Sequence, residues 1–152
     1  MKVRRAAQKL AADIKLAQQK AVSEMSVVNF RVEVDENRYS AMVRDRNSPV
    51  KASEDSLFWW RDYYDDYVED PLNRGAYLLV DFDEQASRFK GAQITSINAG
   101  VYTVSTYGFY LSPLGDLRWP FANTTITTTD PGSGYSRQVQ ISYPMAKVTL
   151  LP

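Results

Sequence analysis

The fold is decided by the N-terminal segment Val3–Val28, which reads VRRAAQKLAADIKLAQQKAVSEMSVV. Its apolar residues recur at steps of three and four, which is the spacing of one face of an α-helix. These residues are Val3, Ala7, Leu10, Ile14, Ala17, Ala21, Met25 and Val28. No Gly or Pro interrupts the segment, and Ala, Lys, Gln and Leu are strong helix formers. The sequence therefore predicts one long amphipathic helix that occupies residues 1–28.

The apolar face of this helix is narrow and rich in alanine, so the helix can lie close to a sheet. We expect the helix–sheet docking face to be formed by Leu10, Ile14, Ala17 and Ala21. An unpaired carboxylate is strongly unfavourable in such an interface. Ile14→Asp should therefore lower the thermal stability greatly, whereas Gln18→Asp should not.

The composition excludes several classes of protein. The 152 residues are enough for one domain with a substantial core. Eighteen basic and eighteen acidic residues cancel, which argues against a nucleic-acid-binding protein and against a polybasic membrane-surface protein. The chain has no His and no Cys, which excludes zinc sites built from these residues, Ser-His-Asp catalysis and thiol chemistry. No run approaches the ~20 apolar residues that span a bilayer.

The rest of the chain has the pattern of β-structure. Alternating apolar and polar residues over 29–44, with a turn at Asp35–Arg38, predict a β-hairpin. Residues 76–152 form a second β-rich region, in which Ser112-Pro113-Leu114-Gly115 has the composition of a tight turn. A long helix followed by many strands indicates an α+β fold, with the helix packed on an antiparallel sheet in one domain over 1–152.

An insertion at 45–75 separates the two β-rich regions. A short helix is expected to begin near Ser53 and to end before Pro71, with Leu57, Trp60, Tyr64 and Val68 on one face. One helix face buries only about half of the six aromatic residues between 58 and 67. An ordinary amphipathic helix explains most of this pattern. The alternatives are a partner surface at Trp59, Tyr63 and Tyr67, and a carbohydrate-binding platform over residues 57–67.

The acidic residues do not assemble a convincing metal site. Asp62, Asp65, Asp66, Glu69 and Asp70 offer oxygen ligands for Ca²⁺, but a solvated acidic face is the simpler interpretation. The segment from Asp81 resembles an EF-hand loop only superficially, because Ala86 and Ala92 replace the essential Gly and Glu. The separation of a carboxylate pair is not readable from sequence, so glycoside hydrolysis stays open as a third alternative. It ranks below a binding function because, with eighteen acidic residues, an arbitrary pair carries almost no weight. We expect no cofactor, no metal and no catalysis.

Three sequence features together resemble the type IV pilin-like proteins, and more narrowly the minor pseudopilins of the GspH/FimT type from type II secretion systems. The helical segment LAADIKLAQQKAV, Leu10–Val22, resembles a helix motif of that family. It is followed, as in the family, by a hairpin with Tyr39 in its second strand. The late segment FYLSPLG, Phe109–Gly115, resembles the family's motif before the last strands.

The resemblance implies a structural subunit of a bacterial type II secretion or type IV pilus-like filament that assembles with other pilin-like subunits. It implies no cofactor, no nucleic acid and no small-molecule substrate. Family members are held in the inner membrane by an N-terminal apolar helix and face the periplasm. That helix is not among residues 1–152, so we expect this chain to be a soluble piece of a longer protein, with Met1 a supplied start. The insertion at 45–75 departs from the family pattern.

Overall fold

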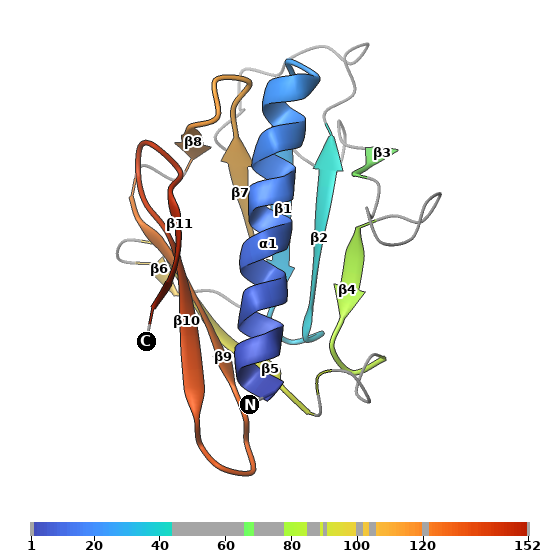
Figure 1. Ribbon diagram of the computed structural model, residues 1–152, viewed down its shortest axis with the longest axis vertical. Coiled ribbons are helices and arrows are strands. Elements are labelled where there is room, and N and C mark those ends of the chain that lie inside the picture. Colours follow the sequence, from blue (N-terminus) through green and yellow to red (C-terminus); the bar gives the residue numbers. More distant parts are fainter. Residues whose placement is uncertain are drawn as a thin grey trace.

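The computed structural model describes residues 2–43, 66–68, 78–84, 89, 91–99, 102–103, 106–119 and 122–151. In this part of the chain, helix α1 (Lys2–Ser23) packs against two antiparallel sheets (Figure 1). The hairpin sheet contains β1 (Val28–Glu33), β2 (Arg38–Val43), β3 (Asp66–Tyr67), β4 (Leu79–Asp81), β7 (Thr106–Leu111) and β8 (Leu117–Trp119). The C-terminal sheet contains β5 (Gln93–Ala99), β6 (Tyr102–Thr103), β9 (Thr124–Thr129), β10 (Ser136–Ile141) and β11 (Val148–Leu151).

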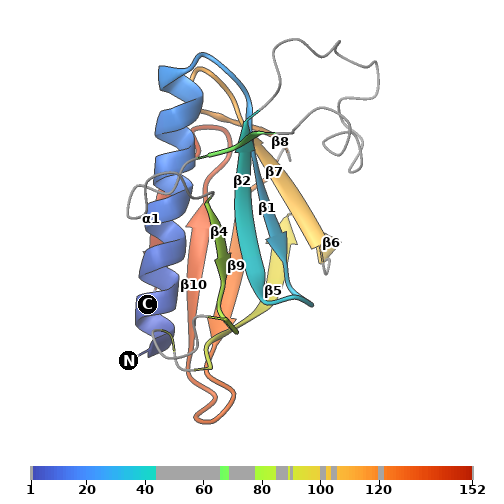
Figure 2. The same cartoon turned by 90° about the vertical axis from the view of Figure 1, so that its right-hand side faces the viewer.

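The order of the strands shows how the chain passes between the two sheets. The hairpin sheet runs β3-β2-β1-β7-β8, with β4 also paired to β2, and the C-terminal sheet runs β11-β10-β9-β5-β6. The chain therefore leaves the hairpin sheet after β4, forms β5 and β6, and returns for β7 and β8 before completing the C-terminal sheet. Both sheets lie on one side of α1, which follows the long axis of the molecule (Figure 2). The predicted α+β fold, with a long helix packed on antiparallel sheet, is confirmed.

Helix α1 ends at Ser23, five residues earlier than the predicted end at residue 28. The amide of Ser26 bonds to the carbonyl of Ala21 at 3.0 Å, and the amide of Met25 bonds to that of Val22 at 3.2 Å. With Met25 in the left-handed region at φ 51°, this is the Schellman arrangement that closes a helix. Met25 is consequently 79% exposed, although the periodicity had placed it on the apolar face.

The hairpin forms where it was predicted, with β1 and β2 joined by a turn at residues 34–37. Phe30 of β1 stacks on Tyr39 and Phe109, with ring centroids 5.4 and 5.2 Å apart, at the centre of the core. The alternation of β1 had predicted a solvated second face, but Asn29 and Glu33 on that face are only 1% and 6% exposed. On that face Asn29 lies between Met42 of β2 and Tyr110 of β7, so large side chains flank it on both sides.

The tight turn predicted at Ser112–Gly115 is present between β7 and β8. The amide of Gly115 donates to the carbonyl of Ser112 at 2.9 Å, and Gly115 adopts φ 85°. A side chain added at Gly115 would meet Cγ2 of Val22 at 3.3 Å. The position therefore requires glycine both for its backbone conformation and for its close approach to α1.

Most of the predicted insertion, residues 45–75, lies outside the described residues. Its described part contradicts a helix that continues to Pro71, because Asp66–Tyr67 form strand β3 and pair with Val43 and Met42 of β2. The amide of Val68 continues this pairing and donates to the carbonyl of Ala41 at 2.9 Å. The open edge of β2 explains the difference, since it offers unpaired backbone groups that an extended segment satisfies.

Candidate functional site

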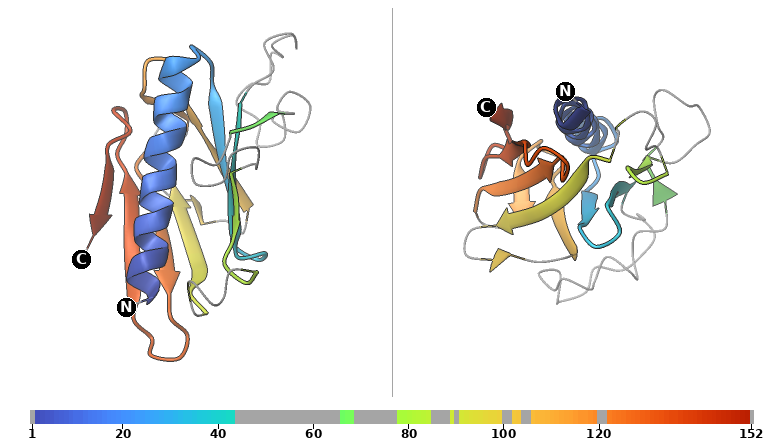
Figure 3. Two further views of the ribbon diagram at one scale, coloured as in Figure 1. Left: turned by 45° about the vertical axis from the view of Figure 1, so that its right-hand side comes forward. Right: turned by 90° about the horizontal axis from the view of Figure 1, so that it is seen from below.

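The four residues predicted to form the docking face of α1 are all fully buried. Leu10, Ile14, Ala17 and Ala21 are 0% exposed and belong to the hydrophobic core. The helix contacts β1 and β7 of the hairpin sheet and β9, β10 and β11 of the C-terminal sheet. Seen along its axis, α1 lies over the junction of the two sheets (Figure 3). Full burial of an Ile or Leu side chain contributes roughly 1.5–3 kcal/mol, so this face contributes to holding both sheets in place.

A carboxylate lies inside this apolar interface. Asp13 is only 3% exposed, and its Oδ2 accepts a hydrogen bond of 2.7 Å from the hydroxyl of Tyr39 on β2. Its Oδ1 accepts from Nζ of Lys9, one helical turn earlier, at 2.9 Å. Hydrogen bonds to a charged acceptor are stronger than neutral ones. Asp13 therefore joins α1 to the hairpin sheet by a polar contact at a defined position.

Sequence reasoning gave Asp13 no role, although a signal was present. Asp13 directly precedes Ile14 and follows Leu10 by three residues, which places it at the margin of the buried stripe. A carboxylate at that margin needs a partner. The amphipathic pattern does not say which donor on the sheet supplies it.

The opposite face of α1 is polar and basic. The exposed residues of the helix are Arg4, Arg5, Gln8, Ala12, Lys15, Gln19, Val22 and Ser23. Three of them are cationic and none is acidic. This face is exposed along the helix, although Val22 near its end lies close to Gly115 of the β7–β8 turn. It is a surface on which another chain can associate.

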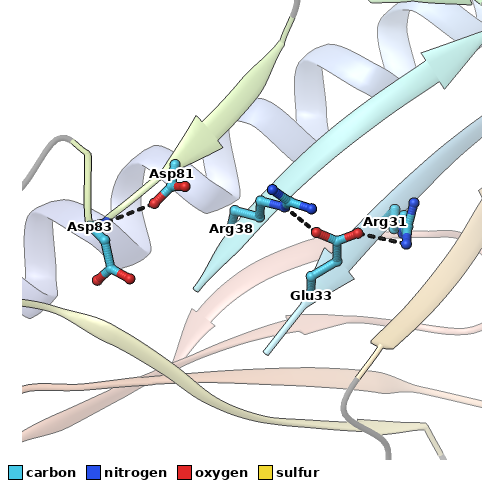
Figure 4. Close-up of polar contacts among 5 residues, drawn as sticks. All are labelled: Arg31, Glu33, Arg38, Asp81 and Asp83. Atoms are coloured by element: carbon cyan, nitrogen blue, oxygen red, sulfur yellow. Dashed lines mark hydrogen bonds and ion pairs between the residues drawn. The ribbon is translucent and has the colours of Figure 1, made fainter. Parts of the chain in front are cut away.

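A compact ion-pair cluster lies on the outer side of the hairpin (Figure 4). Glu33 accepts from Nη2 of Arg31 at 2.6 Å and from Nε of Arg38, its neighbour across the hairpin. The bond to Glu33 raises the pKa of the Arg38 guanidinium, with smaller contributions from Glu36 and Asp81. Arg38 therefore stays charged, and each carboxylate oxygen of Glu33 is paired with a guanidinium group, which links the two strands of the hairpin.

The turn of the same hairpin is joined to β5 by Asn37. Its amide Nδ2 donates to Asp83 and to the carbonyl of Ala92, both at 3.0 Å. Its Oδ1 accepts the backbone amide of Ile94 at 2.8 Å. Asn37 is 6% exposed and has φ 52°, a conformation that Asn tolerates better than most residues. This network connects the two sheets at the end of the molecule remote from the β7–β8 turn.

The predicted partner surface falls mainly outside the described residues. Trp59 and Tyr63 are not among them, and Tyr67 lies on β3 opposite Met42, with its side chain not described. The proposed carbohydrate platform at 57–67 is described only at its last two residues, which are extended. The described residues contain no group of three or more His, Cys, Asp or Glu side chains placed to hold a metal ion.

Within the described part of the chain, no helix combines the length and the apolar character that crossing a membrane requires.

Comparison with solved structures gives matches over almost the whole chain. The minor pseudopilin EpsH from the type 2 secretion system of Vibrio cholerae is similar with a TM-score of 0.63 and 12% identity, over 99% of this chain and 97% of that one. The type IV minor pilin FimU of Pseudomonas aeruginosa is similar with a TM-score of 0.54 and 16% identity, over 99% of this chain and 88% of that one. No protein-family model and no curated protein sequence matches the chain.

These similarities establish the fold. The chain has the pilin-like fold of the minor pseudopilins, as its helix motif, hairpin and late turn had indicated.

Proposed function

We propose that this chain is a structural subunit of a bacterial type II secretion or type IV pilus-like filament, and that it acts by assembling with other pilin-like subunits. The observation that carries the proposal is the match to EpsH, which extends over 97% of that protein and 99% of this chain. The second match, to FimU, is also to a subunit of a pilin-like class rather than to an enzyme. A polar, accessible helix face supports association through protein surfaces.

The finer assignment is to the GspH/FimT type of minor pseudopilin, in the inner membrane and facing the periplasm. It rests on the sequence motifs Leu10–Val22 and Phe109–Gly115. The start of α1 lies towards the same end of the molecule as the β9–β10 turn (Figure 1), so an apolar helix joined to it would extend past that turn along the long axis. Such a helix would supply the membrane anchor, while the domain would need no cofactor, nucleic acid or small-molecule substrate.

The proposal is tested in the bacterium that encodes the chain, with an affinity tag placed after residue 152. We expect the tagged protein in the inner membrane fraction and accessible to protease once the outer membrane is permeabilised. Mild crosslinking before purification should recover pilin-like subunits of one filament system. A protein that remains in the cytoplasm, or that is recovered without any pilin-like subunit, would contradict the proposal.

A further inference from the structure

An open groove lies beside the C-terminal half of α1, between the helix and the turns that precede β8 and β11. Its volume is about 670 Å³, and its lining includes more apolar than polar surface. The lining residues are Lys15, Gln18, Gln19, Val22, Ser23, Gly115, Ala146, Lys147 and Val148. None of these nine residues is acidic, and two of them, Lys15 and Lys147, are exposed lysines. The groove therefore combines positive charge with apolar surface.

The walls of the groove are held in position by contacts within the fold. Nε2 of Gln18 donates to the carbonyl of Gly115 at 2.5 Å, and Gly115 packs against Val22. The amide of Leu117 donates to the carbonyl of Pro144 at 2.8 Å, which joins the two turns to each other. A groove with fixed walls loses little conformational entropy when it is filled.

Exposed apolar side chains occur in the groove and on the turns that line it. Val22 in its lining is 47% exposed, and the turns that line it through Gly115 and Ala146 also carry Leu114 and Met145, which are 89% and 72% exposed. Large aliphatic side chains that gather on one part of a surface usually mark a site of association. Val22 lines the same groove as Lys15 and Lys147, so the surface favours an occupant that is apolar and negatively charged.

We propose that this groove binds an amphipathic segment of a neighbouring pilin-like subunit, and that the segment presents aliphatic residues flanked by Asp or Glu. The aliphatic side chains would cover Val22 and Val148, and the carboxylates would meet Lys15 and Lys147. This is the helix-in-groove form of recognition, in which apolar anchors contribute affinity and the charges select the partner. The proposal rests on the proposed function and specifies which surface performs the assembly.

Two synthetic helical peptides of equal length and leucine content serve as probes, one with Glu and one with Lys at its polar positions. Each is titrated into the ¹⁵N-labelled protein, and amide shifts are followed by NMR. The Glu peptide should shift the amides of Lys15, Gln19, Val22, Gly115 and Lys147. It should bind about tenfold more tightly than the Lys peptide, as two surface ion pairs allow.

Charge reversal then identifies the lysines as the cause. In the double variant Lys15→Glu/Lys147→Glu, the preference should invert and favour the Lys peptide. Arg4→Glu/Arg5→Glu is the matched control, because it reverses two exposed charges at the far end of the same helix. That control should keep the original preference. Equal affinity for both peptides, no binding of either, or shifts centred away from the groove would overturn the proposal.

A crosslinking arm separates this proposal from the proposed function. A photoreactive residue replaces Gln19 in the groove or, as a control, the exposed Gln8 on the same helix. In the native filament system, position 19 should crosslink to a pilin-like subunit, and Lys15→Glu/Lys147→Glu should abolish this crosslink. That result supports the groove as the binding surface. Crosslinks to such subunits from position 8 alone overturn the groove and leave the proposed function standing. Absence of pilin-like subunits from both positions counts against both.

Discussion

At the scale of single residues, the contact between Asp13 and Tyr39 shows how a polar pair contributes to a helix–sheet interface. The carboxylate is nearly completely buried and the phenol is 1% exposed, so both groups are shielded from bulk water. The ring of Tyr39 also stacks on Phe30, which positions the hydroxyl for Asp13. Removing one member leaves the other buried without this hydrogen bond, which costs more stability than replacing both members by apolar groups.

We therefore predict that Tyr39→Phe destabilises the protein by about 1.5–3 kcal/mol, the range for a hydrogen bond to a charged group. The substitution keeps the ring and removes only the donor to Asp13. Tyr135→Phe is the control, since Tyr135 is 47% exposed and the change should be within about 0.5 kcal/mol. Urea unfolding followed by circular dichroism measures both. A loss for Tyr39→Phe no larger than that of the control would show that the buried bond contributes little.

Residues of this kind mark the limit of prediction from sequence. Leu10 and Ile14 are recognisable because burial follows directly from helical spacing. Asp13 and Asn37 are not, because their long-range partners lie 26 and 46 to 57 residues away and depend on the tertiary register. Gln18 illustrates the same limit. It had been predicted to tolerate Asp, yet its amide bonds to Gly115, so Gln18→Asp is no longer a neutral substitution.

At the scale of elements, existence and type were more predictable than boundaries. The helix, the hairpin and the later strands follow from periodicity, whereas the helix end depends on a backbone arrangement. Residues Met25 and Val28 continue the apolar spacing, but the left-handed conformation at Met25 ends the helix and starts β1. The extended segment at β3 was also missed, because the edge of β2 that pairs with it is a tertiary feature. Local sequence patterns indicate neither the end of α1 nor the pairing of β3.

The β7–β8 turn allows a test in which backbone strain is separated from steric contact. Gly115→Ala should destabilise by about 1–2 kcal/mol from its left-handed backbone alone, with a further loss because the new Cβ would crowd Val22. Gly91→Ala has a similar φ of 76° and no atom within 4 Å, so it should show the strain alone. Gly132→Ala has no positive φ and should cost least. Chemical unfolding ranks the stabilities of the three variants. If Gly115→Ala loses no more stability than Gly91→Ala, the contact with Val22 does not contribute.

At the scale of the whole molecule, α1 contacts both sheets within the described part of the chain. Its buried face reaches β1 and β7 on one side and β9, β10 and β11 on the other, while Asn37 supplies a second connection through Ile94. The sheets share one hydrophobic core cluster, which includes residues of both. The fold class was predictable from the order of one helix and many strands. The division into two sheets was not, because β5 and β6 interrupt the hairpin sheet in sequence without joining it.

This arrangement predicts that damage to the docking face of α1 destabilises both sheets together. Ile14→Asp places a carboxylate where the side chain is 0% exposed, and an uncompensated buried charge costs about 3–5 kcal/mol. Gln8→Asp introduces the same charge at an exposed position of the same helix and replaces Gln18→Asp as the control. Thermal unfolding followed by near- and far-UV circular dichroism should give one coincident transition, with a much lower midpoint for Ile14→Asp and little change for Gln8→Asp. Two separate transitions, or equal midpoints for the two variants, would contradict a shared core organised by α1.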